Sequence, residues 1–272
     1  MSNIINSFWF QSAPPSSSYI LDEISSTPIY AWSFTRYLTA AWVGNPVVRL
    51  KRTSDNTERD FNVEELTDGT AESWTGVGDA RSTIWYDQTG NGKNCFQNNN
   101  AYQYRMIIGG VLARDSNGYP CSLGGIPSGV RGYNIPSATL TGTNGAVFTA
   151  FKSTIKDYAP VEWHVMGGHG GSASNYILGR NKVANLVTIG SAYANGVVQP
   201  TNLLSVDLIE CIVNAIGVNW TSNAIWTSGG AVMFNYFVET GTQLSEAIVF
   251  NTFDSAERAQ IETNQNDFYG YF

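Results

Sequence analysis

Charged side chains are scarce in this sequence. Of its 272 residues, 14% are Asp, Glu, Lys or Arg, whereas an average soluble domain has about 25%. The balance is acidic, with 22 Asp and Glu against 15 Lys and Arg and a formal net charge of −7. Nucleic-acid binding depends on Lys and Arg that neutralise phosphates, and attraction to an anionic membrane surface needs the same side chains. We therefore expect neither of these partners.

Cysteine and histidine are also rare. Cys95, Cys121 and Cys211 are widely separated and odd in number, so neither a disulfide framework nor a cysteine metal site is expected, and each is interpreted as a small buried apolar residue. The histidines, His164 and His169, do not share one helix face and have no third ligand nearby. The sequence thus predicts no metal and no cofactor. His169, among several glycines, is a candidate for a binding loop.

Long apolar runs are missing as well. No segment approaches the roughly 18 apolar residues of a membrane-spanning helix, so no membrane insertion is expected. The first residues, MSNIINSFWFQSAPPSSS, have no cationic region and no clear cleavage site, so we expect no secretory signal either. A composition rich in Ser, Thr, Asn and Gly, without an export signal, favours a protein that is made in a host cytoplasm and later exposed on the surface of a virion.

Short β-type segments separated by turn signals fill most of the chain. They include Arg105 to Leu112 and Leu244 to Phe250, and turn pairs such as Asn117-Gly118 and Asn195-Gly196 separate several of them. Many short strands with regular turns indicate an antiparallel sandwich or barrel. We predict one all-β domain over residues 28–272, a two-sheet antiparallel β-sandwich with short helices near its two ends.

Two helices and an N-terminal segment complete the predicted organisation. Apolar residues from Tyr30 to Ala41 recur at helical spacing, and Asp254 with Glu257 forms a capping-box pattern before a C-terminal helix. Residues 1–27 end in a linker rich in Pro and Ser and carry five large apolar side chains between Ile4 and Phe10. We expect this segment to attach the domain to other virion proteins or to copies of itself, and we expect a homo-oligomer.

Three motifs occur in an order that resembles a known family. They are NPVVRLKRTSDNTERDFN (45–62), IWYDQTGNGKNCFQ (84–97) and the C-terminal LSEAIVFNTFDSAERAQIETNQNDFYGYF (244–272). The chain from about residue 30 to residue 272 resembles the concanavalin-A-like (laminin-G-like) jelly-roll domains related to the catalytic domain of α-L-arabinofuranosidase B. Such domains are common in bacterial surface proteins and in bacteriophage fibre and spike proteins. The resemblance implies a jelly-roll fold, which carries both lectins and hydrolases.

The turn after the strand-like Trp85 and Tyr86 is the candidate binding site. Two glycines supply the backbone geometry of a tight turn, with acid and amide side chains beside the two aromatic rings. An aromatic face can stack on a sugar ring while amides bond its hydroxyls, but an ordinary self-bonded loop uses the same residue types. The candidate carbohydrate-binding residues are Trp85, Tyr86, Asp87, Gln88, Asn91, Asn94 and His169.

These features favour a virion structural protein of spike or fibre type whose sandwich binds host cell-surface carbohydrate. The alternative is a glycoside hydrolase resembling α-L-arabinofuranosidase, which needs two carboxyls that flank the scissile bond. The nucleophile and acid of the resembled family cannot be placed by a local motif, and its adjacent cysteines are missing, so no catalytic residue is assigned. Glu210 and Glu246 are expected to point outward at strand edges. The candidate acids are Asp87, Glu162, Asp207, Glu210, Glu239 and Glu246.

Overall fold

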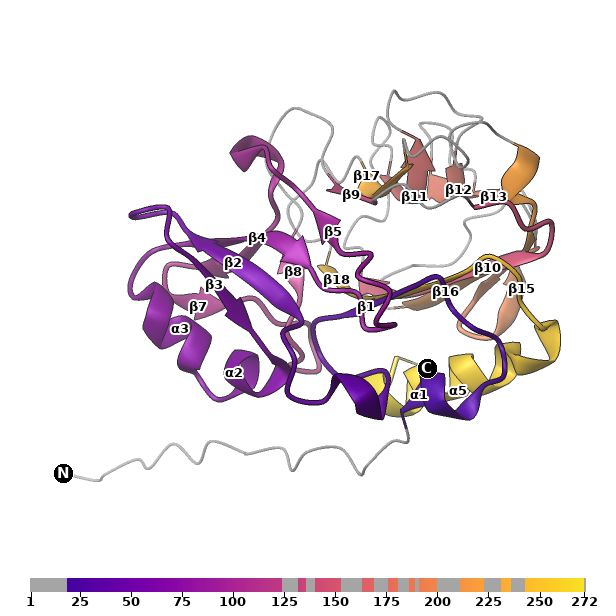
Figure 1. Cartoon of the computed structure of the whole chain (residues 1–272), viewed down its shortest axis with the longest axis horizontal. Coiled ribbons are helices and arrows are strands. Elements are labelled where there is room, and N and C mark those ends of the chain that lie inside the picture. The colour runs from indigo at the N-terminus through magenta and orange to yellow at the C-terminus, as the bar shows by residue number, and fades with distance from the viewer. Residues whose placement is uncertain are drawn as a thin grey trace.

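The computed structural model describes a β-sandwich with short helices on its outside (Figure 1). The described residues are 19–123, 132–135, 140–152, 163–168, 176–180, 186–188, 191–199, 211–222, 231–235 and 243–271. The helical elements are α1 (Ile20–Glu23), η1 (Ala40–Trp42), α2 (Val63–Thr67), α3 (Thr70–Thr75), η2 (Asn100–Tyr102), η4 (Trp220–Ser222), η5 (Ser255–Glu257) and α5 (Arg258–Tyr269). Within these ranges, no helix is both long enough and apolar enough to cross a membrane.

The strands are short, as the spacing of the turn signals predicts. They are β1 (Tyr30–Ser33), β2 (Val48–Arg52), β3 (Glu58–Phe61), β4 (Ala80–Trp85), β5 (Cys95–Phe96), β6 (Arg105–Ile108), β7 (Val111–Leu112), β8 (Ser122–Leu123), β9 (Tyr133–Asn134), β10 (Gly145–Lys152), β11 (Trp163–Gly168), β12 (Tyr176–Arg180), β13 (Leu186–Thr188), β14 (Ser191–Ala194), β15 (Val197–Gln199), β16 (Cys211–Val218), β17 (Ala231–Asn235) and β18 (Gln243–Phe250).

Two layers of antiparallel strands face each other in Figure 1. One layer contains β1, β18, β10, β16, β14 and β15, in that order of pairing. The other contains β5, β9, β17, β11, β12 and β13. Strand β4 connects the layers at one edge, because its end pairs with β5 while its start pairs with β6, which leads through β8 to β18. This confirms the predicted two-sheet antiparallel sandwich.

Strand β18 lies between β1 and β10 and is buried on both faces. Ala247 and Val249 pack into the main core between the layers, whereas Ile248 and Phe250 pack on the opposite face with residues of α1 and α5. Burial on both faces explains the nearly continuous apolar run in this strand. Glu246 is fully buried as well, so its predicted outward orientation is wrong.

The helix predicted from Tyr30 to Ala41 is wrong, because the last two residues of this segment alone are helical, as part of η1. Residues Tyr30–Ser33 form β1, are all buried, and pair antiparallel with β18, Tyr30 opposite Val249. Aromatic side chains suit a strand that packs against a core. Pairing with β18 therefore overrides the helical spacing of the apolar residues, and the short N-terminal helix is instead α1.

Residues 19–27, the described part of the N-terminal segment, pack against the sandwich. Ile20 is buried in one cluster with Ile261 of α5. The Glu257 carboxylate accepts hydrogen bonds from the Ser25 amide (2.5 Å), the Ser25 hydroxyl (2.7 Å) and the Ser26 amide (3.1 Å). Burial alone would raise the pKa of Glu257, but these bonds outweigh it and lower the pKa. Ile4 to Phe10 lie outside the described residues, so their attachment role stays a prediction.

Candidate functional site

A cleft of about 380 Å³ opens between three segments that are far apart in the sequence. They are residues 21–28 around α1, residues 39–45 around η1, and residues 88–91 in the loop between β4 and β5. The volume falls within the roughly 300–1,000 Å³ of typical small-molecule sites. We refer to this cleft, lined by residues of these three segments, as the Trp42 cleft.

The first wall is joined to the second by Asp22. One carboxylate oxygen of Asp22 accepts from the Thr39 hydroxyl (2.7 Å) and the other from the Ala40 amide (2.8 Å). The Leu21 amide also donates to the Leu38 carbonyl (2.9 Å). These bonds hold the α1 segment beside η1, although β1 and the loops on either side of it separate the two in the sequence.

The second wall presents an aromatic ring and an amide. The Trp42 indole is half-buried against the main core, and its Nε1–H donates to the Pro46 carbonyl (3.0 Å), which fixes the orientation of the ring. The chain then turns at Gly44, whose φ of +78° suits glycine. The Asn45 backbone amide donates back to the Trp42 carbonyl (2.9 Å), and the exposed Asn45 side chain, which lines the cleft, donates to the Ala41 carbonyl (3.5 Å).

The third wall is a loop organised by the buried Asp87 carboxylate. It accepts from the Thr89 amide (3.2 Å) and hydroxyl (2.6 Å), from the Lys93 amide (3.2 Å) and from the Ala31 amide (3.0 Å). The Asn94 side chain in turn accepts from the Asp87 amide (2.9 Å). Burial raises the pKa of Asp87, and the hydrogen bonds from Thr89, Ala31 and Lys93 act in the opposite direction. Asp87 therefore shapes the loop from inside.

Gln88 connects this loop to the segment that carries the second wall. Its side-chain oxygen accepts from the Leu38 amide (2.7 Å), and its side-chain nitrogen donates to the carbonyls of Ser33 (3.2 Å) and Arg36 (3.1 Å). Three of the four hydrogen bonds that a glutamine side chain can make are thus formed with backbone groups. Residues 89–91 follow directly and reach the cleft, where Gly90 adopts a φ of +81°.

The structure places the predicted site residues in different surroundings. Trp85, Asp87 and Gln88 are fully buried, and of these only Gln88 lines the Trp42 cleft, together with the exposed Asn91. Tyr86 is half-buried and donates to Asp60 (2.7 Å). Asn94 supports the Asp87 backbone, as described above. His169 lies outside the described residues. The buried members hold the loop in shape, and Asn91 is the member that the loop presents to solvent.

The missed residues at this site are Trp42, Asn45 and Asp22. Sequence reasoning overlooked the first two because it interpreted this segment as a core-packing helix that ends before Gly44. The signal that could have found them is the stretch AWVGN, in which an aromatic residue precedes Gly44 and an amide within a turn. Asp22 carries no comparable local signal, because its partners Thr39 and Ala40 are brought to it by the fold.

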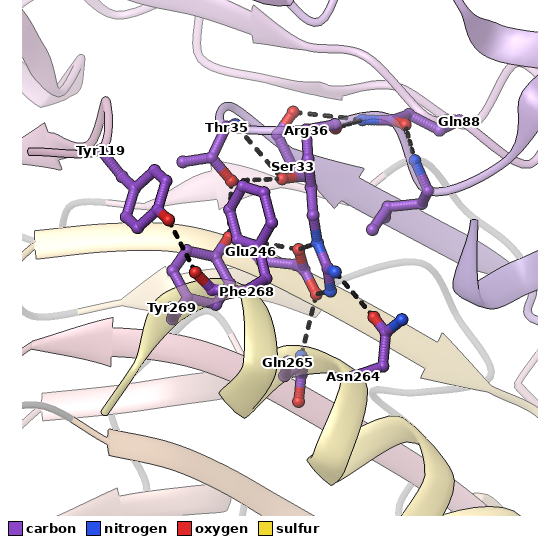
Figure 2. Close-up of polar contacts among 11 residues, drawn as sticks. Ser33, Thr35, Arg36, Gln88, Tyr119, Glu246, Asn264, Gln265, Phe268 and Tyr269 are labelled. Atoms are coloured by element: carbon purple, nitrogen blue, oxygen red, sulfur yellow. Dashed lines mark hydrogen bonds and ion pairs between the residues drawn. The ribbon is translucent and has the colours of Figure 1, made fainter. Parts of the chain in front are cut away.

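A second polar cluster is buried between β18, α5 and the segment after β1 (Figure 2). The Arg36 guanidinium binds both Glu246 oxygens, at 2.7 and 2.8 Å, and also Asn264 (2.6 Å). Gln265 (3.0 Å) and the Tyr269 hydroxyl (3.2 Å) donate to the same carboxylate. Burial would lower the pKa of Arg36, but Glu246 raises it overall.

The candidate acids do not form a catalytic pair among the described residues. Glu246 is fully buried and occupied by the partners given above, and Asp87 is buried and bonded to its own loop. A general acid or nucleophile must reach the substrate, which neither carboxylate does in this structure. Glu162, Asp207, Glu210 and Glu239 lie outside the described residues.

Comparison with known proteins finds similar structures only. No protein-family model and no curated protein matches the sequence. Among solved structures, the chain is similar to a GH54 α-L-arabinofuranosidase soaked with a cyclic sulfate inhibitor (13% identity, TM-score 0.45). It is also similar to an arabinofuranosidase complexed with arabinofuranosyl-α-1,2-xylobiose (14% identity, TM-score 0.48). Both alignments cover 94% of this chain and 65% of the enzyme chain. At this similarity no residue role is transferred.

Proposed function

We propose that this chain is a carbohydrate-binding β-sandwich and that the Trp42 cleft holds the sugar. The observation that carries the proposal is the combination, in one cleft, of the half-buried Trp42 indole with the exposed amides of Asn45 and Asn91. An indole offers a flat apolar face to the C–H side of a sugar ring. Amides both donate to and accept from hydroxyls, which suits a ligand whose hydroxyls do the same.

The rigidity of the cleft supports the same proposal. Asp22 bonds the α1 segment to η1, and Gln88 bonds the β4–β5 loop to the chain before η1. The walls are therefore held before any ligand arrives, which lowers the entropy that binding must pay. Apolar contacts from Leu21, Ile24 and Pro28 complete a mainly uncharged lining.

Replacing Trp42 with alanine is expected to weaken sugar binding by about tenfold or more, which corresponds to roughly 1.4 kcal/mol for the loss of ring stacking. The ligand is found first by a glycan array with the full chain, and its affinity is then measured by titration calorimetry. Val43→Ala is the matched control, since Val43 is in the same turn, is 47% exposed and does not line the cleft.

Because Trp42 also touches the core, a second variant separates binding from folding. Asn91→Ala alters an exposed loop side chain and is expected to weaken binding while the midpoint of urea unfolding stays unchanged. If neither Trp42→Ala nor Asn91→Ala changes the affinity for a sugar that the wild-type protein binds, the sugar site is elsewhere in the molecule.

Hydrolysis of an α-L-arabinofuranoside, the substrate class named for the similar structures, is the second candidate function. The same chain is incubated with 4-nitrophenyl α-L-arabinofuranoside and with arabinose-substituted xylo-oligosaccharides, and released product is measured. Turnover that depends on one of the acids Glu162, Asp207, Glu210 or Glu239 would replace binding by hydrolysis as the function. Exposure of the protein on a virion, with residues 1–27 as its attachment, is a separate prediction that incorporation of a truncated chain into particles would test.

A further inference from the structure

We propose that the Trp42 cleft selects uncharged sugars over acidic ones and that Asp22 sets this selectivity. The inference rests on the proposed function, because it names the class of sugar that the same cleft takes. It concerns a charge at the site and not its shape, so it can be tested with pairs of sugars that differ in one carboxylate.

The charges around the cleft are one-sided. Asp22 is exposed and is a lining residue, whereas no Lys, Arg or His is found among the residues of the described chain that line the cleft. The protein as a whole has a formal net charge of −7. A sugar carboxylate that enters the cleft would therefore be repelled by a like charge and would find no cation among these lining residues. A neutral sugar carries a hydroxymethyl group in place of the carboxylate, so it would not be repelled and would need no cation.

The hydrogen bonds of Asp22 keep its charge in place. Both carboxylate oxygens accept bonds, from the Thr39 hydroxyl and the Ala40 amide, so the side chain cannot turn away from an approaching anion without losing them. These donors are neutral and leave the full negative charge on the carboxylate. Two like charges about 4 Å apart in water repel by an amount that corresponds to roughly fivefold in affinity.

The substitution Asp22→Asn removes this charge and can keep both bonds. The asparagine oxygen can accept from the Ala40 amide, while its NH₂ group donates to the Thr39 hydroxyl, which then acts as an acceptor. The walls of the cleft are thereby expected to stay joined. Asp22→Asn is thus close to a pure change of charge at the site, in contrast to Asp22→Ala, which would also break the contact between α1 and η1.

The experiment compares methyl glucoside with methyl glucuronide, and methyl galactoside with methyl galacturonide, by titration calorimetry at 20 mM salt. For the wild-type protein we expect the neutral member of a pair to bind roughly fivefold or more tightly than the acidic one. We expect the ratio to fall towards one at 1 M salt, where the Debye length is about 3 Å. In Asp22→Asn the ratio should fall towards one already at low salt.

The outcomes separate the two proposals. If neutral and acidic members bind the wild-type protein equally at low salt, or the acidic one binds better, the selectivity is wrong although the cleft binds sugar. If the ratio is the same in Asp22→Asn, or does not change with salt, Asp22 is not its cause. If Asp22→Asn does not fold, the salt dependence of the wild-type ratio still decides whether the selectivity is electrostatic. If no sugar on the glycan array binds, the proposed function itself fails.

Discussion

Replacing Arg36 with methionine is expected to lower the free energy of unfolding by about 3–5 kcal/mol, the usual cost of leaving one partner of a buried ion pair uncompensated. Glu246 is fully buried, and Arg36 supplies two of the bonds to its carboxylate. Methionine fills a similar volume but offers no donor to Glu246 or to Asn264. Urea denaturation followed by tryptophan fluorescence measures the change.

The double variant Arg36→Met with Glu246→Leu provides the control. Removing both charges eliminates the uncompensated carboxylate, and buried ion pairs can often be replaced by apolar residues at little cost. Gln265 and Tyr269, which donate to Glu246, would lose this acceptor, so we expect partial and not full recovery of stability. A loss below about 1 kcal/mol in the single variant would mean that water reaches Glu246 and that the pair is not truly buried.

This ion pair also explains how the C-terminal helix is held on the sandwich. Figure 2 shows Arg36 reaching from the segment after β1 to Glu246 of β18 and to residues of α5. Its guanidinium carbon lies 4.8 Å from the centre of the Phe268 ring, within cation–π distance. The segment after β1 is therefore joined at one point to β18 and α5, which lie more than 200 positions later in the sequence, and the Arg36 carbonyl continues the connection to Gln88 and the Trp42 cleft.

Those parts of the fold that depend on local chemistry were predictable. The Asn195-Gly196 pair has positive φ at both positions, 49° and 76°, and it joins β14 to β15 as its sequence indicates. Strand β1 is the opposite case. Its helical spacing of apolar residues is a local signal, but the conformation is decided by pairing with β18, more than 200 positions away in the sequence. No local pattern contains that information.

The candidate site was predictable only in part, for a related reason. Asp87 and Gln88 are polar, and polarity in a turn is equally consistent with a solvent-facing site and with bonds to buried backbone groups. Which of the two applies depends on whether unpaired amides and carbonyls lie nearby, as those of Ala31, Leu38 and Ser33 do here. The loop named from the sequence contributes residues 88–91 to the Trp42 cleft, whereas Asp22, Trp42 and Asn45 come from two other segments.

Replacing Trp85 with alanine is expected to lower the free energy of unfolding by about 3–5 kcal/mol, the range for emptying a core aromatic site. Trp85 is fully buried, and its ring stacks on Phe34 with 4.3 Å between ring centres. It also lies 5.9 Å from Trp32 and 5.7 Å from Tyr133, so it connects aromatic residues of β1 and β9, which belong to opposite layers. Denaturation in urea measures the loss.

The comparison of Trp85→Ala with Trp42→Ala decides which aromatic residue meets the sugar. Both variants remove an indole, but one empties the core and the other the cleft wall, so we expect the first to lower stability and the second to lower affinity. Trp85→Phe serves as the control, because a smaller ring can keep the stacking on Phe34 and should recover much of the stability. For both Trp85 variants, the affinity of the folded fraction is expected to equal that of the wild-type protein. A lower affinity at unchanged stability would instead mean that Trp85 becomes accessible on binding and contacts the ligand.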